Sequence, residues 1–332
     1  MNLYLGVDGG GTSTELCLLT DEGEVVASTL AAGTYHLGSA EGVGLVGRIL
    51  GAALDELFAA TPAARSHVRY AFVGLPGWGE ARGDEPALSA VVAAALGHDR
   101  FRCDNDVICG WAGSLGLADG VHVVCGTGSI GYGYRAGEGA RVGGWGETFG
   151  DEGSGYWIGC RGLQAFSRMS DRRIPAGPLA DVIRTRLGVE EDLDVIDVVI
   201  HRWVGDRGRI AGLAPDVVEA ARRGDAAAAG ILDDAAAELA ELAHTARRRL
   251  GFDPSAAVPV SYSGGVFRAP EVLAAFGHRL SEVEGALGGR FELRVPSHSP
   301  VVGAALYAAS LAGAPLGATA RERLRQSAGT VG

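Results

Sequence analysis

The sequence contains no lysine, and all 29 of its basic residues are arginine. A Walker-type phosphate loop needs its lysine to reach the β- and γ-phosphates of a nucleotide, so this chain cannot hold a nucleotide in that way. In a chain without lysine, the charge of any phosphate ligand would have to be met by Mg²⁺, backbone N–H groups, hydroxyls or helix N-termini. The net charge is −11 and no basic run is longer than Arg247–Arg249, which argues against nucleic acid as a partner.

Cysteines and aromatic residues are also scarce. None of the five cysteines forms a C-x-x-C pair, which favours buried free thiols of a reducing cytoplasm over a disulfide or a metal site. No basic leader precedes an apolar stretch at the N-terminus, so we expect no signal peptide and a cytoplasmic protein. The uncharged run 301–320 is rich in Ala and Gly and is broken at Pro315, so we expect a core helix and no membrane span.

The periodicity of apolar residues predicts one α/β unit that occurs twice, because the same order of strands and helices starts again near residue 120. A length of 332 residues suits two domains, predicted as 1–119 with a C-terminal helix 300–332, and 120–299 with a helical insertion. The predicted strands are 2–7, 13–19, 24–29, 68–73, 101–106, 121–125, 130–134, 141–143 and 259–263. The predicted helices are 42–60, 86–96 and segments that begin near residues 151, 178, 216, 225, 270 and 300.

Two strands run into hairpins rich in glycine and hydroxyl residues. Glycine lets backbone N–H groups approach phosphate oxygens that side chains would block, so both hairpins are predicted nucleotide-phosphate loops. The second hairpin also contains a G-x-G-x-x-G pattern, but residues 130–134 alternate like a strand where a dinucleotide site needs a helix. Glycine hairpins without a ligand remain an alternative for each loop. The predicted phosphate-binding residues are Gly9, Gly10, Gly11, Thr12, Ser13, Gly126, Thr127, Gly128 and Ser129.

Three further segments carry chemistry. Gly144, Trp145 and Gly146 precede Asp151, so that an indole face and a carboxylate could contact a sugar, although an acidic helix N-cap is an alternative for Asp151. The turn at the end of a predicted strand could lie against a base or ribose, and it consists of Ser263, Gly264, Gly265 and Val266. Asp106 ends another strand and could deprotonate a hydroxyl, or could form an Asx turn.

Taken together, these motifs resemble the eukaryotic-type N-acetylglucosamine kinases and the BadF/BadG-type ATPases of the actin-like, hexokinase and Hsp70 superfamily. The resemblance extends from Tyr4 to about Ala309. It implies two ribonuclease H-like (actin-like ATPase) domains facing a nucleotide cleft, with ATP and Mg²⁺ as cofactors. It also implies that Asp8 handles Mg²⁺, directly or through water, that residues 263–266 line the adenosine, that Asp106 is the base, and that Trp145 and Asp151 approach the sugar.

The chain departs from this family where a sugar-contacting asparagine is expected, because it has Thr34, Tyr35 and His36 there. The segment Val73–Glu80 also carries an additional Pro-Gly-Trp. We therefore expect an ATP-dependent kinase that phosphorylates an amino sugar, with O6 as the acceptor. Glucosamine, N-acetylmuramic acid or glucose as substrate remain alternatives, as do a BadF-type activator with an iron–sulfur cluster and a non-catalytic sugar sensor. Related kinases are commonly homodimers, although no heptad repeat in the sequence indicates one.

Overall fold

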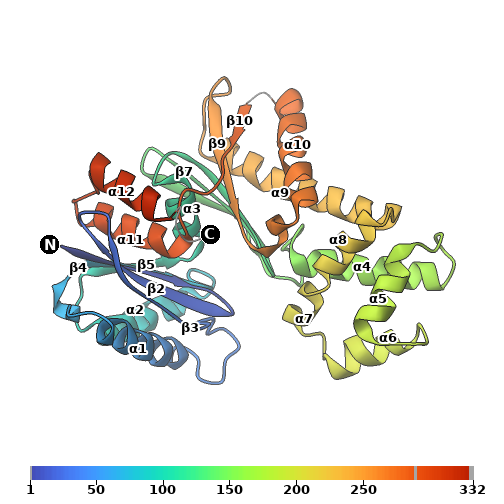
Figure 1. Ribbon diagram of the computed structural model, residues 1–332, viewed down its shortest axis with the longest axis horizontal. Helices are drawn as coiled ribbons and strands as arrows, with labels where there is room; N and C mark the ends of the chain where they lie inside the picture. Colours follow the sequence, from blue (N-terminus) through green and yellow to red (C-terminus); the bar gives the residue numbers. More distant parts are fainter. Residues whose placement is uncertain (1, 288–289, 329–332) are drawn as a thin grey trace. The chain divides into compact units, whose positions relative to one another are not determined.

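The computed structural model of the protein describes residues 2–287 and 290–328, and it is shown in Figure 1. The chain divides into two compact units. Unit 1 consists of Met1–Ala118 and Val295–Gly332, and unit 2 consists of Asp119–Arg294. The C-terminal segment of the chain is therefore part of the same unit as the N-terminal strands.

Unit 1 contains a five-stranded sheet in the order β3-β2-β1-β4-β5. Strand β2 is antiparallel to both β1 and β3, whereas β4 is parallel to both β1 and β5. The strands are β1 (Leu3–Gly9), β2 (Ser13–Thr20), β3 (Val25–Ala32), β4 (Val68–Leu75) and β5 (Phe101–Asn105). The helices are α1 (Gly44–Ala59), α2 (Glu85–Leu96), α3 (Val107–Leu115), α11 (Pro300–Leu311) and α12 (Ala318–Ala328), with short 3₁₀ turns at Arg65–His67 and Arg82–Asp84.

The core of unit 1 lies on the two faces of this sheet. Strand β1 is almost wholly buried, and α1 and α2 contribute apolar residues such as Leu54 and Val92 to the cluster beneath it. Helix α11 packs against α3 and β1 (Figure 1). Its small residues allow this close contact, since a Cβ on Gly303 would clash with the backbone of Cys109 and Gly113 in α3. The uncharged run after Pro300 is thus a core helix, as predicted, and it ends at Leu311.

Unit 2 repeats the same topology. Its sheet has the order β10-β9-β6-β7-β8, which matches the first sheet strand for strand when β6 to β10 are set against β1 to β5. The antiparallel pairs are again β6–β7 and β7–β8, and the parallel pairs are β6–β9 and β9–β10. The strands are β6 (Gly120–Cys125), β7 (Ser129–Arg135), β8 (Glu138–Gly143), β9 (Ala257–Ser263) and β10 (Arg290–Leu293). The predicted duplicated α/β fold is confirmed.

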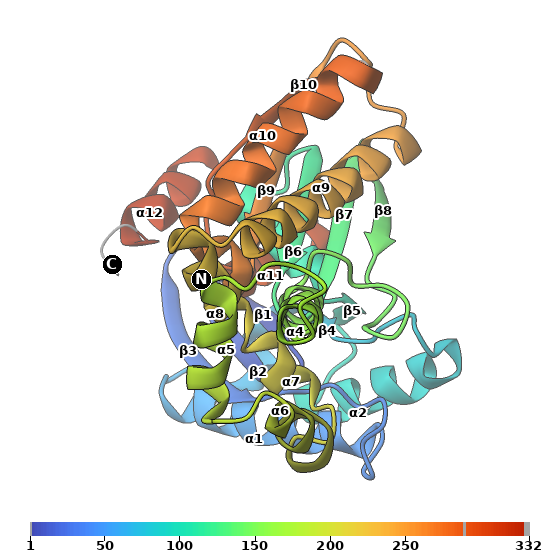
Figure 2. The same ribbon diagram turned by 90° about the vertical axis from the view of Figure 1, so that its right-hand side faces the viewer.

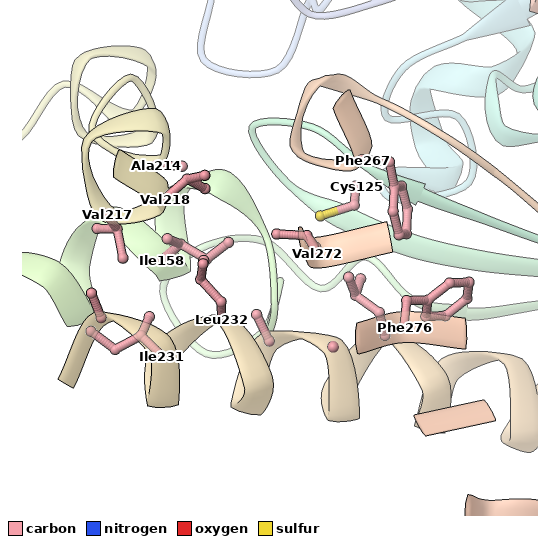
Figure 3. Close-up of a cluster of buried hydrophobic side chains, with 14 of the residues drawn as sticks. Cys125, Ile158, Ala214, Val217, Val218, Ile231, Leu232, Phe267, Val272 and Phe276 are labelled. Atoms are coloured by element: carbon pink, nitrogen blue, oxygen red, sulfur yellow. The ribbon is translucent and has the colours of Figure 1, made fainter. Parts of the chain in front are cut away.

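Helices of unit 2 cover its sheet and continue into an all-helical segment. Helices α9 and α10 lie side by side (Figure 2), and α9 contacts β6 and β7. Ile158, Leu232 and Phe276 from three different helices belong to one buried cluster, shown in Figure 3. The helices are α4 (Gly155–Ser170), α5 (Pro178–Leu187), α6 (Asp194–Ile196), α7 (Arg207–Ala211), α8 (Ala214–Arg222), α9 (Ala226–Arg249) and α10 (Pro270–Leu287), with a π-helix at Asp197–Arg202 and a 3₁₀ helix, η4, at Gly265–Arg268.

Most predicted elements differ from the observed ones by a few residues at their ends, and two of these differences concern candidate site residues. The helix expected from about Asp151 begins at Gly155, because Asp151 has a left-handed backbone (φ 56°) and the N-cap is Ser154, whose hydroxyl accepts the N–H of Trp157. The strand expected to reach Asp106 ends at Asn105. The cysteines carry free thiols, and four of the five are buried, as expected. Within residues 2–287 and 290–328, no helix combines the length and apolarity that a membrane span requires.

Candidate functional site

In unit 1, several strands end at the same edge of the sheet. Strands β1, β4 and β5 are parallel, and β3 runs in the same direction because both it and β1 are antiparallel to β2. Open α/β sheets bind ligands beyond the carboxyl ends of such strands. Asp8, Asp106 and the segment 34–36 all lie at or just beyond these ends. The structure therefore brings the predicted site residues of unit 1 together.

The first glycine loop is the turn between β1 and β2. The N–H of Gly10 donates to the carbonyl of Ser13 at 2.8 Å, and the N–H of Thr34 donates to the carbonyl of Gly10 at 3.0 Å. A Cβ on Gly9 would lie 2.6 Å from the hydroxyl oxygen of Thr34 and 2.7 Å from the carbonyl oxygen of Gly74, so no side chain fits there. The loop residues exposed to solvent are Gly11, Thr12 and Ser13.

Asp8 lies at the end of β1 and is only partly accessible. Its removal from water, and then the negative charges of Asp106 and Glu15, raise the pKa of its carboxyl to about 8. A hydrogen bond from the thiol of Cys109 opposes this shift. Carboxylates that lie close together repel one another through their negative charges, and a bound cation would relieve this repulsion.

Asp106 is the first residue after β5 and the N-cap of α3, yet its side chain makes no capping hydrogen bond. The Asx turn is formed instead by Asn105, whose side-chain oxygen accepts the N–H of Val107 at 3.2 Å. The neighbouring Asp104 forms an ion pair with Arg102 at 2.7 Å. The side chain of Asp106 is therefore not used to cap α3, and its place just beyond the carboxyl end of β5 suits a catalytic base.

The side chains of the segment after β3, residues 34–36, differ in how far they are exposed to solvent. The hydroxyl of Thr34 is buried and lies 3.3 Å from that of Thr14. The ring of His36 is also buried, with Nε2 3.4 Å from a carboxylate oxygen of Asp84. Tyr35 is 40% exposed, so it is the residue of this segment whose ring is accessible to a ligand.

The loop that follows β4 lies against Tyr35 and the end of β5. A Cβ on Gly77 would be 3.2 Å from the ring of Tyr35 and 3.6 Å from a carboxylate oxygen of Glu80. The side-chain amide of Asn105 donates to the carbonyl of Trp78 at 3.4 Å. The additional Pro-Gly-Trp of this loop is thus close to both Tyr35 and the residue that precedes Asp106.

In unit 2, the second glycine loop joins β6 to β7 and is fixed to the start of α4. The N–H of Gly126 donates to the carbonyl of Gly128 at 2.9 Å. The N–H groups of Gly155 and Tyr156 donate to the carbonyls of Gly126 and Thr127 at 2.8 and 3.2 Å. Residues 129–135 form a strand, which confirms that the G-x-G-x-x-G pattern does not open a helix.

The turn after β9 lies against this loop, because β6 and β9 are parallel neighbours. The hydroxyl of Ser263 is 3.0 Å from Nε2 of His122 in β6. Gly264 has φ 102°, and a Cβ there would clash with the carbonyl of Cys125. A Cβ on Gly155 would lie 3.5 Å from a methyl of Val266. The predicted adenosine and phosphate segments of unit 2 are therefore adjacent.

The Gly-Trp-Gly segment follows β8, and Gly144 and Gly146 adopt left-handed backbones with φ of 69° and 86°. Trp145 is 71% exposed, which leaves its indole face open to a ligand. Asp151, by contrast, is 3% exposed and forms an ion pair with Arg207 at 2.6 Å. Arg207 lies 56 positions away in sequence, and nothing in the sequence pattern had indicated it.

Both units thus have the topology of the two-domain actin-like ATPases and sugar kinases. The profile of the BadF/BadG/BcrA/BcrD ATPase family matches residues 5–308, and the chain belongs to this family. The resemblance predicted from the sequence is confirmed.

Relatives and solved structures agree with this assignment. The chain is 30% identical over 284 residues to an N-acetyl-D-glucosamine kinase of Dictyostelium discoideum, covering 82% of this chain and 88% of that one. It is 30% identical over 255 residues to an N-acetylmuramic acid/N-acetylglucosamine kinase of Clostridium acetobutylicum, covering 72% of this chain and 77% of the relative. The crystal structure of a putative N-acetylglucosamine kinase from Chromobacterium violaceum superposes with a TM-score of 0.71 at 27% identity, covering 92% of this chain and 98% of that one.

Proposed function

We propose that this chain is an ATP-dependent kinase that transfers the γ-phosphoryl group of ATP to a hydroxyl of an amino sugar, with O6 of N-acetylglucosamine as the first candidate. The observation that carries the proposal is the carboxylate of Asp106, which lies at the end of β5 without capping α3. Its sheet edge also holds Asp8 and the first glycine loop. The kinases among the relatives support the same activity.

In this mechanism Asp106 accepts the proton of the sugar hydroxyl as the hydroxyl oxygen attacks the γ-phosphorus. The bond from that phosphorus to the β,γ-bridging oxygen breaks, and ADP leaves. The protein contributes mainly position and charge neutralisation, because the transition state spreads negative charge over the phosphoryl oxygens. A base in this position typically contributes 10²- to 10⁴-fold to the rate, as an order of magnitude.

The donor set of unit 1 fits Mg²⁺. Mg²⁺ takes one or two carboxylates and fills its remaining positions with water and substrate phosphates. This agrees with Asp8, a carboxyl near the end of β1 whose pKa is raised by burial and by neighbouring carboxylates. Bound there, Mg²⁺ would neutralise phosphate charge in a chain that has no lysine. Asp8, directly or through water, would hold it.

The two glycine loops would bind the phosphates through backbone N–H groups and hydroxyls, and the turn after β9 would bind the adenosine. The phosphate contacts come from Gly9, Gly10, Gly11, Thr12, Ser13, Gly126, Thr127, Gly128 and Ser129. The adenosine contacts come from Ser263, Gly264, Gly265 and Val266. For the sugar we propose Thr34, Tyr35, His36, Asp106, Gly144, Trp145, Gly146 and Asp151.

The proposed sugar-binding residues fall into two groups, because Tyr35 and Trp145 are exposed whereas others are buried. The exposed rings can contact a sugar directly, whereas the buried Thr34 and His36 act on it through the backbone that they hold in place. A second substrate, N-acetylmuramic acid, differs from N-acetylglucosamine by a lactyl group. Because Tyr35 is exposed and lies beside the additional Pro-Gly-Trp loop, we propose N-acetylmuramic acid as the second acceptor to test.

The test is a measurement of ADP release by the purified protein with ATP and Mg²⁺. The acceptors are N-acetylglucosamine, N-acetylmuramic acid, glucosamine, glucose and 6-deoxy-N-acetylglucosamine. We expect a 2-acetamido sugar to give the highest kcat/KM and the 6-deoxy sugar to be inactive. No sugar-dependent ADP release with any acceptor would refute the proposal, and turnover of the 6-deoxy sugar would refute O6 as the acceptor.

A further inference from the structure

Arg207 occupies a place that neither the sequence pattern nor the family resemblance had indicated. It begins α7, in the helical segment of unit 2, and its Nη2 donates to a carboxylate oxygen of Asp151 at 2.6 Å. Its Nε lies 3.4 Å from a carboxylate oxygen of Glu147. The guanidinium is therefore placed between two carboxylates of the segment that follows β8.

Asp151 in turn holds two backbone segments. The backbone N–H groups of Gly146, beside Trp145, and of Ser129, at the end of the second glycine loop, stabilise its charged form and lower its pKa. The residue is 3% exposed and has a left-handed φ of 56°, a conformation that a non-glycine residue keeps only where its surroundings impose it. One buried carboxylate thus joins the Gly-Trp-Gly segment, the glycine loop and α7.

The glycine loop is shaped to fit this ion pair. A Cβ on Gly128 would lie 2.5 Å from Nη2 of Arg207 and 2.5 Å from the carboxylate oxygen of Asp151 that Arg207 contacts. Heavy atoms cannot approach a Cβ so closely, and therefore the pair packs directly on the backbone of Gly128 in a space that exists because this residue has no side chain. The loop and the ion pair consequently constrain one another.

We propose that Arg207 is a positioning residue, which holds Asp151 so that the Gly-Trp-Gly segment and the second glycine loop keep one fixed arrangement for sugar and phosphate. This inference rests on the proposed function. In a chain without lysine, a cation from the helical segment thereby sets the geometry of a sugar-binding and a phosphate-binding element at the same time.

The charges around Asp151 indicate why an arginine is needed. Burial raises the pKa of Asp151, and Arg207 lowers it together with the N–H groups of Gly146 and Ser129, whereas Glu147 raises it. The thiol of Cys125 in β6 also lies close enough to Asp151 for that carboxylate to raise the pKa of the thiol. Without Arg207, two carboxylates would remain with no cation between them, and Asp151 would take up a proton at a higher pH and lose part of its capacity to accept hydrogen bonds.

The test compares Arg207→Met and Arg207→Lys with Arg209→Met, which removes an exposed arginine from the same helix. We expect Arg207→Met to raise the KM for the sugar roughly 10- to 100-fold, the effect of a misplaced binding group. The acidic limb of kcat/KM should move to higher pH. Arg207→Lys should recover part of the loss, because it keeps the charge but not the planar fork of donors. Arg209→Met should behave as the parent protein does.

Hydrogen exchange of the unliganded protein gives a measurement that needs no substrate. The amides of Gly146 and Ser129 should exchange faster in Arg207→Met than in the parent, and at the parental rate in Arg209→Met. Gly128→Ala should have the same effect, because the added methyl displaces the ion pair. If the parent phosphorylates no sugar, the proposed function fails, and the exchange rates still decide whether Arg207 positions the two segments.

Parental exchange rates in Arg207→Met would overturn the inference. Faster exchange together with a parental KM and pH profile in an active enzyme would overturn it as well, because Arg207 would then stabilise the loops without any effect on substrate. If Arg207→Met does not fold, the same readouts are taken from Arg207→Lys and Gly128→Ala.

Discussion

The carboxylate of Asp225 accepts a hydrogen bond from the N–H of Leu179 at 2.8 Å, across 46 positions of sequence. Its other oxygen accepts the N–H of Ala228 at 3.0 Å, so that one side chain satisfies the first turns of both α5 and α9. Asp225 is 2% exposed. A single buried residue therefore joins the helical segment of unit 2 to the long helix that covers its sheet.

Replacing Asp225 by alanine should lower the free energy of unfolding by about 2–4 kcal/mol, the loss of one cap plus one buried N–H left without a partner. Asn should cost less, because it keeps one acceptor oxygen. The matched control is Asp206→Ala, which removes an exposed N-cap that serves a single N–H, that of Arg209. Denaturant unfolding of the three variants would measure this, and equal losses for Asp225→Ala and Asp206→Ala would contradict it.

The catalytic prediction concerns Asp106. Asp106→Asn should lower kcat about 10²- to 10⁴-fold with little change in the KM for ATP, since the amide cannot accept the proton of the sugar hydroxyl. Asp104→Asn is the control, because Asp104 is two positions away and is already paired with Arg102. Steady-state kinetics of both variants decide the assignment. Near-normal turnover of Asp106→Asn, with a loss in Asp104→Asn, would transfer the role to Asp104.

Asp8 is tested through the metal. Asp8→Asn should raise the Mg²⁺ concentration needed for half-maximal rate by roughly 10- to 100-fold, the usual cost of losing a group that holds or orients a metal ligand. The measurement is ADP release over a titration of Mg²⁺ at constant free ATP. An unchanged Mg²⁺ dependence would remove Asp8 from the metal site.

Most of the fold could be predicted from the sequence, because the residue patterns that indicate its strands, turns and helices are local. Alternating apolar residues, glycine turns and the repeated order of elements predicted both sheets, and the observed topology confirms the duplication. Strand β10 was missed because it has four residues and pairs in parallel with β9, a partner distant in sequence. The short helix α7 gave no clear apolar period, and the role of Arg207 depends on a contact with Asp151 that no local pattern encodes.

The sugar preference should depend on Tyr35 more directly than on His36, because Tyr35 is exposed and His36 is buried beside Asp84. Tyr35→Asn should change the ranking of acceptors by about 10- to 200-fold, the range for altered pocket volume. His36→Ala should mainly lower stability, because it leaves a cavity. The measurement is kcat/KM across the same sugars. If both variants keep the parental ranking, specificity lies elsewhere, and Trp78 and Glu80 become the next residues to replace.

The last prediction concerns acid stability and His122, which lies in β6 and is fully buried. Burial lowers the pKa of His122 from 6.5 to about 3. The unfolded chain therefore binds a proton at this residue below about pH 6.5, whereas the folded protein does not bind it until about pH 3. The contribution to stability is complete above pH 6.5 and is lost as the pH falls towards 3, by up to about 1.4 kcal/mol per pH unit.

In His122→Gln this titration is absent, so that the free energy of unfolding of this variant should fall less steeply than that of the parent between pH 6.5 and 4. Denaturant unfolding at a series of pH values gives both slopes, and parallel slopes would show that His122 does not destabilise the folded protein in acid.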